Sequence, residues 1–373
     1  MNVNGVIPLF KVFMSDSVNE RVPQVLQSGF IGEGPLVQKF ETAFGEYVHN
    51  PGNIVMLNSG TAAITIALRL AGVGYGDYVA TTPMTCLATN MPILSLGAIP
   101  LWCDILPDGT INPDSVDEWF TCSKFRPKAV ICMDWGGLPC KLNELMEICH
   151  RNGVLLIEDA CQSIGAGYNS RPVGSDADFV CWSFQAIKHL TTGDGGALAI
   201  NGNPDLLEQA RLMKWFGLDR TKSDMLRCGQ DPPFWGYKFQ MNDIAATIGL
   251  ANLENVCWVV RKTRSHAQRY NRQLQDCKSV KVIPFDRERG RSGHWLYTCF
   301  VEDVRHFSNY MKENGIIASK VHDRNDIKSI FPKSKLDLPG VDYFDKHHVC
   351  IPVGWWLSEE DQDKIVTLVQ QYE

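Results

Sequence analysis

The stretch SFQAIKHLTTGDGGALAI contains one lysine, Lys188, between apolar residues and a run of Thr, Gly and Asp. Burial disfavours the charged form of an amine, so a lysine in apolar surroundings has a lowered pKa and can act as a nucleophile. Lys188 follows the apolar run FVCWSF (179–184) by a few residues, so we expect it at the end of a buried strand. For this lysine taken alone, a solvated place in a surface loop is the simpler interpretation.

Two acidic residues, Glu158 and Asp159, follow the apolar run VLLI (154–157). If VLLI is a strand of a parallel sheet, a carboxylate at its end points into the crevice where such sheets bind ligands. A buried carboxylate is costly unless a cation or a hydrogen-bond donor meets it, and a protonated heterocyclic nitrogen would be such a partner. A carboxylate that only caps the following turn agrees equally well with this pattern.

Ser59, Gly60 and Thr61 stand between the apolar run IVML (54–57) and a helical pattern. Gly60 permits a tight turn, and the free amide hydrogens of a helix N-terminus suit a phosphate. Taken alone, the three residues are more simply a turn with a Ser or Thr cap. A phosphate site, a strand-end carboxylate and a nucleophilic lysine in one α/β unit together predict a site for pyridoxal phosphate (PLP).

The elements that would position these residues alternate along the chain. Short apolar runs, separated by amphipathic helical patterns, occupy residues 54–57, 78–82, 99–103, 128–133, 154–157, 179–184 and 196–200. This alternation predicts an α/β fold with a mostly parallel sheet that helices cover on both faces. After about residue 250, a long helical stretch leads to HWLYTCFV and to further helices, which predicts a smaller α+β domain. We therefore expect a large domain over residues 1–250 and a small domain over residues 251–373.

The composition and the charge of the chain limit the classes of protein to which it can belong. The chain has 373 residues, of which 45% are hydrophobic and 21% charged, as is typical of a soluble globular protein. Its net charge of -6, without a basic block, argues against nucleic-acid or anionic-membrane binding. No run approaches the roughly 20 apolar residues that span a bilayer, and the N-terminus lacks the pattern of a signal peptide. The thirteen cysteines include no CxxC pair, so we expect a reduced, cytoplasmic protein without a metal site.

Six motifs follow one another along nearly the whole chain. They are GFIGEGPLVQKFE (29–41), NSGTAAI (58–64), IEDACQSIGA (157–166), SFQAIKHLTTGDGG (183–196), GYKFQMNDIAATIG (236–249) and KENGIIASKVHDRND (312–326). In these motifs and in their order the chain resembles the DegT/DnrJ/EryC1/StrS family of PLP-dependent sugar aminotransferases, which have the fold type I (aspartate aminotransferase-like) scaffold. The resemblance implies a seven-stranded sheet in the large domain, and homodimers whose active sites are shared between subunits.

The resemblance also implies a role for each matching residue. Lys188 would form the Schiff base with PLP and move the proton, while Asp159 would pair with the pyridine nitrogen. Gln162 would lie beside the cofactor ring. The phosphate of PLP would be bound by Gly60, Thr61 and Ser183.

Two cofactor positions depart from the family's pattern. Cys86 stands where many members carry an aromatic residue that stacks on the pyridine ring, so stacking must be weaker or come from elsewhere. Lys238 stands where many members have an asparagine that reaches the phosphate of the neighbouring subunit. A lysine could do so as a point charge, or could simply lie on the surface. On the substrate side we expect His322, Arg324 and Asp326, and the Arg324 guanidinium could meet a diphosphate.

The resemblance implies transfer of an amino group from glutamate, which leaves as 2-oxoglutarate, to a nucleotide-linked keto-deoxy sugar. The commonest substrate type of the family is a 4-keto-6-deoxyhexose on dTDP or GDP, and the product would serve glycan or lipopolysaccharide synthesis. One branch of the family replaces the lysine with histidine and dehydrates the sugar. Here Lys188 holds that position and His189 follows it, which favours transamination. A PLP-dependent sugar dehydratase, an aminocyclitol aminotransferase and an inactive PLP-fold regulatory protein are the alternatives.

Overall fold

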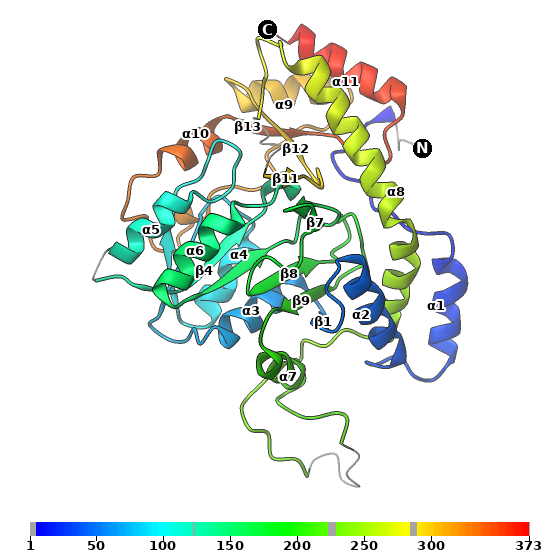
Figure 1. Ribbon diagram of the computed structural model, residues 1–373. Helices are drawn as coiled ribbons and strands as arrows, with labels where there is room; N and C mark the ends of the chain where they lie inside the picture. Colours follow the sequence, from blue (N-terminus) through cyan, green and yellow to red (C-terminus); the bar gives the residue numbers. More distant parts are fainter. Residues whose placement is uncertain (1–4, 122–123, 223–228, 284–288, 373) are drawn as a thin grey trace.

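A seven-stranded sheet forms the centre of the fold in the computed structural model, which describes residues 5–121, 124–222, 229–283 and 289–372 (Figure 1). The strand order is β1-β9-β8-β5-β4-β2-β3. The strands are β1 (Ile54–Leu57), β2 (Tyr78–Thr81), β3 (Ile99–Trp102), β4 (Pro127–Met133), β5 (Leu155–Asp159), β8 (Phe179–Ser183) and β9 (Gly196–Ile200). Six of these strands run in the same direction, and β9 runs opposite to them. The predicted mostly parallel, seven-stranded sheet is therefore confirmed.

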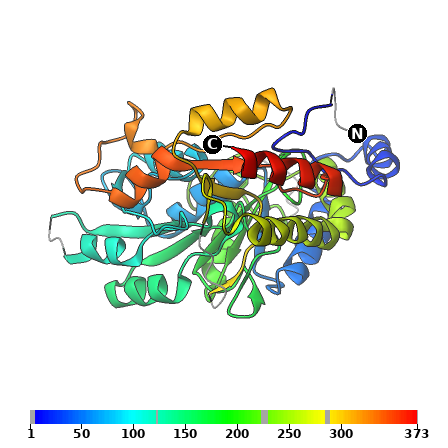
Figure 2. The same ribbon diagram turned by 90° about the horizontal axis from the view of Figure 1, so that it is seen from above.

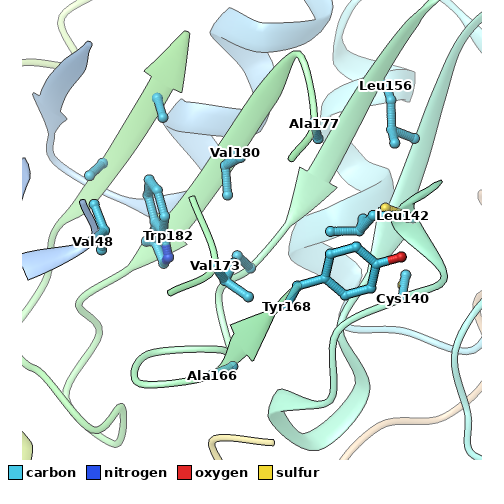
Figure 3. Packing of buried hydrophobic residues seen from close by; sticks show 14 of the residues in the cluster. Val48, Cys140, Leu142, Leu156, Ala166, Tyr168, Val173, Ala177, Val180 and Trp182 are labelled. Atoms are coloured by element: carbon cyan, nitrogen blue, oxygen red, sulfur yellow. The ribbon is translucent and has the colours of Figure 1, made fainter. Parts of the chain in front are cut away.

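Helices cover both faces of this sheet because successive residues of each buried strand point to opposite sides. One face packs against α2 (Pro35–Tyr47), α5 (Pro113–Thr121), α6 (Leu142–Asn152) and the first part of α8 (Asp243–Leu274). The other face packs against α3 (Gly60–Leu70), α4 (Leu87–Ser95) and α7 (Pro204–Met213). Figure 3 shows part of the first layer, where Val180 and Trp182 of β8 lie among other buried apolar side chains.

A second, antiparallel sheet lies in the C-terminal part of the chain. It consists of β10 (Lys281–Val282), β12 (Tyr297–Phe300) and β13 (His348–Ile351). The helices α9 (Val304–Glu313), α10 (Pro339–His347) and α11 (Glu359–Gln371) also belong to this part. The long helix α8 runs from the central sheet to this region, and α11 lies beside its far end (Figure 2). A domain boundary near residue 250, which falls inside α8, stays a prediction.

The N-terminal segment joins this C-terminal region rather than the central sheet. Ile7 forms a parallel bridge with Ile316, and its backbone bonds to Gly315 and Ile317. The following helix, α1 (Val18–Gln27), then packs along α8. The residues around Ile7 are thereby placed next to those around Ile316, which matters for the site described below.

A third, small sheet and several helices were not indicated by the sequence patterns. The small sheet contains β11 (Gly290–Arg291), β6 (Gly167–Tyr168) and β7 (Arg171–Pro172). Among the helices, α4 contains Pro92 and α1 contains Pro23, and an internal proline obscures a helical pattern in a sequence. No helix among the described residues is long and apolar enough to cross a membrane.

Candidate active site

A cavity of about 490 Å³ lies where the ends of β5 and β8 meet the start of α3. These strands are parallel, so their carboxyl ends share one edge of the sheet. Of the predicted site residues, the lining of the cavity contains Gly60, Thr61, Cys86, Asp159, Gln162, Ser183, Lys188 and His322. Lys238 and Arg324 are not part of this lining.

Lys188 lies in the loop after β8, with its side chain partly buried in the cavity. Burial of the amine lowers its pKa, an effect that the nearby Cys161, Cys86 and Asp159 partly oppose. The Lys188 Nζ atom lies 3.4 Å from the ring centroid of Trp295. The position matches the expectation of an amine that apolar surroundings make more nucleophilic.

Asp159 ends β5 and is 3% exposed. Its Oδ2 atom accepts a hydrogen bond from the Thr89 hydroxyl at 2.6 Å, and its Oδ1 atom accepts one from the Cys161 N–H at 3.1 Å. These two donors fix the carboxylate at the cavity, where it can meet a positively charged or protonated group.

The adjacent Glu158 does not line the cavity, because neighbouring residues of a strand point to opposite faces. Its carboxyl group is fully buried near Asp134, and burial together with that negative neighbour raises the pKa of Glu158 well above its usual value. Burial also raises the pKa of Asp134 to about 6. Only the second of the two predicted strand-end carboxylates is therefore available to a ligand.

The N-terminus of α3 forms one end of the cavity, where a phosphate can bind. Ser59 caps the helix by accepting a hydrogen bond from the Ala62 N–H at 3.1 Å. A Cβ atom on Gly60 would lie 2.7 Å from the Cys161 Sγ atom and 3.0 Å from the Ser183 Cβ atom. Glycine is therefore needed for α3 to approach β8, and this approach brings the Ser183 hydroxyl to the same end of the cavity as the helix N-terminus.

Gln162 and His322 form a hydrogen-bonded pair on the cavity wall. The Gln162 Oε1 atom accepts from the Gly136 N–H at 2.7 Å, so its amide nitrogen faces the His322 Nε2 atom at 3.2 Å. The amide must donate in this contact, so the ring nitrogen accepts. Burial, reinforced by the Lys188 charge, lowers the pKa of His322 to about 3, which keeps its ring neutral.

The aromatic side chains of the cavity come from residues that the sequence did not single out. Cys86 lines the cavity as the residue before α4, so no ring is present at that position. Phe10 and Trp295 also line the cavity, and their rings stack with centroids 5.2 Å apart. Phe10 belongs to the N-terminal segment and Trp295 lies just before β12, separated from it by Leu296. No local pattern marks either residue as part of a site.

Arg324 and Lys238 have surroundings of their own outside the cavity. The Arg324 guanidinium bonds to Asp326 at 2.7 and 2.8 Å and also contacts Asp342. These carboxylates raise its pKa and neutralise its charge locally. The Lys238 side chain is exposed, with its Nζ atom 3.4 Å from the Trp215 ring centroid.

The groups that converge on the cavity fit PLP. A helix N-terminus and a serine hydroxyl suit the phosphate, a fixed carboxylate suits the pyridine nitrogen, and a lysine with a lowered pKa suits the carbonyl carbon. Among the described residues, no group of three or more His, Cys, Asp or Glu side chains is arranged to hold a metal ion.

The sequence and the fold resemble those of known sugar aminotransferases. The model of the DegT/DnrJ/EryC1/StrS aminotransferase family matches residues 14–370. The spore coat polysaccharide biosynthesis protein SpsC of Bacillus subtilis (strain 168) is 28% identical over 98% of this chain and 97% of its own. The dTDP-4-dehydro-2,3,6-trideoxy-D-glucose 4-aminotransferase of Saccharopolyspora spinosa is 29% identical over 84% of this chain and 83% of its own. The crystal structure of the sugar aminotransferase CalS13 from Micromonospora echinospora is 35% identical, has a TM-score of 0.92 and covers 98% of this chain and 100% of its own.

Proposed function

The chain belongs to the DegT/DnrJ/EryC1/StrS aminotransferase family, and from this premise we propose that it transfers an amino group from glutamate to a keto-deoxy sugar carried on a nucleotide. The observation that carries this proposal is the convergence of Lys188, Asp159 and the N-terminus of α3 on one cavity. The 4-aminotransferase from Saccharopolyspora spinosa supports a 4-keto-6-deoxyhexose on dTDP as the acceptor, and GDP is the alternative carrier. The relative SpsC supports an amino sugar destined for a polysaccharide.

The enzyme depends on PLP, which when bound supplies the electron sink that lets an amino group pass between two carbon skeletons. Asp159, which Thr89 and the Cys161 N–H hold in place, would bind the proton of the pyridine nitrogen. Ser183 and the N-terminus of α3 would bind the phosphate. Lys188 would carry the cofactor through its amine.

Lys188 would also move the proton during the transfer. Its lowered pKa leaves a larger share of its amines neutral near neutral pH than an exposed lysine would have. The neutral Nζ atom can accept the proton from the donor carbon, and the ammonium can return a proton to the ketone carbon of the acceptor. The apolar wall that Leu9, Phe10 and Ile187 contribute to the cavity limits the competing access of water.

We also propose a homodimer in which the two subunits share each active site. The chain that follows α7 extends away from the central sheet (Figure 1), and Phe216 and Trp235 in this region expose large apolar surfaces. Such exposed apolar surface is typical of protein interfaces. The exposed Lys238 side chain, which lies outside the cavity of its own subunit, could then bind as a point charge to the phosphate in the partner's cavity.

A substrate panel tests the proposed reaction. The enzyme is incubated with glutamate that carries isotope-labelled nitrogen and with dTDP-, GDP- or UDP-linked 3- and 4-keto sugars, and the products are read by mass. We expect labelled nitrogen in one class of nucleotide sugar, with an equal amount of 2-oxoglutarate. A product that has lost water and carries no label would show that the enzyme dehydrates the sugar instead of aminating it. A protein that binds PLP but turns over none of these sugars, while it aminates a free cyclitol ketone, would exclude the nucleotide-linked substrate.

A further inference from the structure

The indole ring of Trp295 covers the reactive end of Lys188. The Nζ atom lies 3.4 Å from the ring centroid, well within the roughly 6 Å at which a cation and an aromatic face attract each other. Both side chains line the same cavity, and Trp295 is 6% exposed. Because Trp295 is buried and Lys188 is partly buried, the attraction is stronger than it would be at a fully exposed site.

Three contacts hold this indole in place. Its Nε1–H donates to the backbone oxygen of Ile187, the residue before Lys188, at 2.9 Å. One stacking partner is Phe10, with ring centroids 5.2 Å apart and an angle of 23° between the planes. The His322 ring lies nearly parallel to it, with centroids 6.4 Å apart. The ring is therefore tied to the loop that carries the lysine and cannot easily turn away from it.

Among the described residues, no carboxylate forms an ion pair with the Lys188 amine, and Asp159 attracts it only at longer range. Other lysines of the chain do form ion pairs. Asp159 uses both of its oxygens to accept hydrogen bonds from Thr89 and Cys161. A carboxylate in contact with the ammonium would hold it firmly and favour its charged form. The face of an indole attracts the ammonium more weakly than a carboxylate does, and the amine can leave it without breaking a hydrogen bond.

We propose that Trp295 is a positioning residue that holds the free ammonium of Lys188 against its ring while the amine is not bonded to the cofactor. This role rests on the proposed function, in which the amine is released in each half-reaction and must stay beside the reacting carbon. Removal of the ring should shift the protonation equilibrium of Lys188 toward the neutral amine by roughly tenfold, or about one pH unit.

The test measures the titration of Lys188 without turnover. The enzyme is loaded with pyridoxamine phosphate, which leaves the lysine free, and is treated with a trace of acetic anhydride at a series of pH values. Acetylation of the Lys188 peptide is read by mass. We expect the midpoint of W295L to lie about one pH unit below that of the wild type, with W295F between them. In steady state, kcat of W295L should fall roughly tenfold, while KM for glutamate stays within about twofold.

A matched control removes a similar contact elsewhere. The Lys335 Nζ atom lies 3.5 Å from the Phe125 ring, and neither residue lines the cavity, so F125L should leave the Lys188 midpoint unchanged. An unchanged midpoint in folded W295L would overturn the role of Trp295, and so would an unchanged midpoint in W295M, which also lacks a ring, if W295L does not fold. The proposed function would survive either result, because it is decided by the sugar panel, and failure of the panel would leave the titration interpretable.

Discussion

Two lysines of this chain lie at the same distance from a tryptophan ring, but in different surroundings. The Nζ atoms of Lys188 and Lys238 are each 3.4 Å from a ring centroid, that of Trp295 and that of Trp215 respectively. Lys188 is enclosed in the cavity, where burial lowers its pKa, while the side chain of Lys238 is exposed. The two lysines therefore share a contact with a ring and differ in burial, and burial is what lowers the pKa of the Lys188 amine.

The elements around each lysine explain the difference. Lys188 follows a strand in the middle of the central sheet, so the ends of β5 and β8 and the start of α3 surround it. Lys238 lies at the surface, on a segment that forms an isolated bridge with Trp215. Lys188 lies beside the other residues of the cavity in its own subunit. Lys238 lies outside that cavity and would need a second subunit to take part in an active site. Substitutions at the two lysines test this contrast.

Replacement of Lys188 with alanine should have the largest effect. We expect the rate of amino transfer to fall by roughly 10⁴-fold or more, because both the bond to the cofactor and the proton transfer depend on this amine. The visible absorbance that PLP shows when bound to a lysine should also disappear, which a spectrum of the purified protein can check. The matched variant K238A should keep that absorbance at saturating PLP. A K188A rate within tenfold of wild type would remove the contrast between the two lysines.

One wall of the site could be predicted from the sequence. Lys188, Asp159 and Gly60 each follow a run of apolar residues, and such runs form buried parallel strands whose ends share one edge. The structure places all three on one cavity for this reason. The same runs predicted the seven strands, because a strand buried on both faces needs no alternation of polar residues.

The opposite wall could not be predicted from such patterns. Phe10 belongs to the N-terminal segment and Trp295 to the C-terminal part of the chain, and the pairing of Ile7 with Ile316 brings these two parts together. Contacts between segments so far apart leave no periodicity in the sequence. The pairing of Arg324 with Asp326 and Asp342 also appears only in the structure, and it places a predicted substrate residue outside the cavity lining.

Acid should lower the free energy of unfolding by a measurable amount, because two histidines are buried in their neutral form. Burial lowers the pKa values of His189, next to Lys188, and of His294 to about 4. Histidine in the unfolded chain binds a proton below about pH 6.5, whereas these folded ones stay neutral to about pH 4. The unfolded state therefore gains protons first, and the free energy of unfolding should fall as the pH drops through this window. Each histidine should contribute up to about 1.4 kcal/mol per pH unit.

Urea unfolding at pH 7 and pH 5 checks this expectation. The variant H189N should lose less free energy of unfolding between the two pH values than the wild type does. The exposed His49 offers a control, since H49N should show the same loss as the wild type. An equal loss in H189N and the wild type would exclude His189 as a source of the acid sensitivity.

Substitution of Lys238 should have the smallest effect. We expect K238A to bind PLP roughly tenfold more weakly, the cost of one lost charged hydrogen bond to the phosphate. K238N should lose less, because its amide can still donate to a phosphate oxygen. Neither variant should change KM for glutamate once PLP is saturating. Dialysis against PLP-free buffer, followed by titration of the cofactor, measures the affinities.

A mixed dimer tests whether Lys238 binds the cofactor phosphate in its own subunit or in the partner subunit. If the sites are shared, a dimer of one K188A and one K238A subunit has one site with both lesions and one with neither. The intact site pairs Lys188 of the K238A subunit with Lys238 of the K188A subunit. At limiting PLP, mixing the two variants should therefore restore activity that neither shows alone. If each site used its own Lys238, no intact site could form, and the mixture would keep the weak PLP affinity of K238A. That outcome would confine both lysines to one subunit and remove the proposed role of the partner.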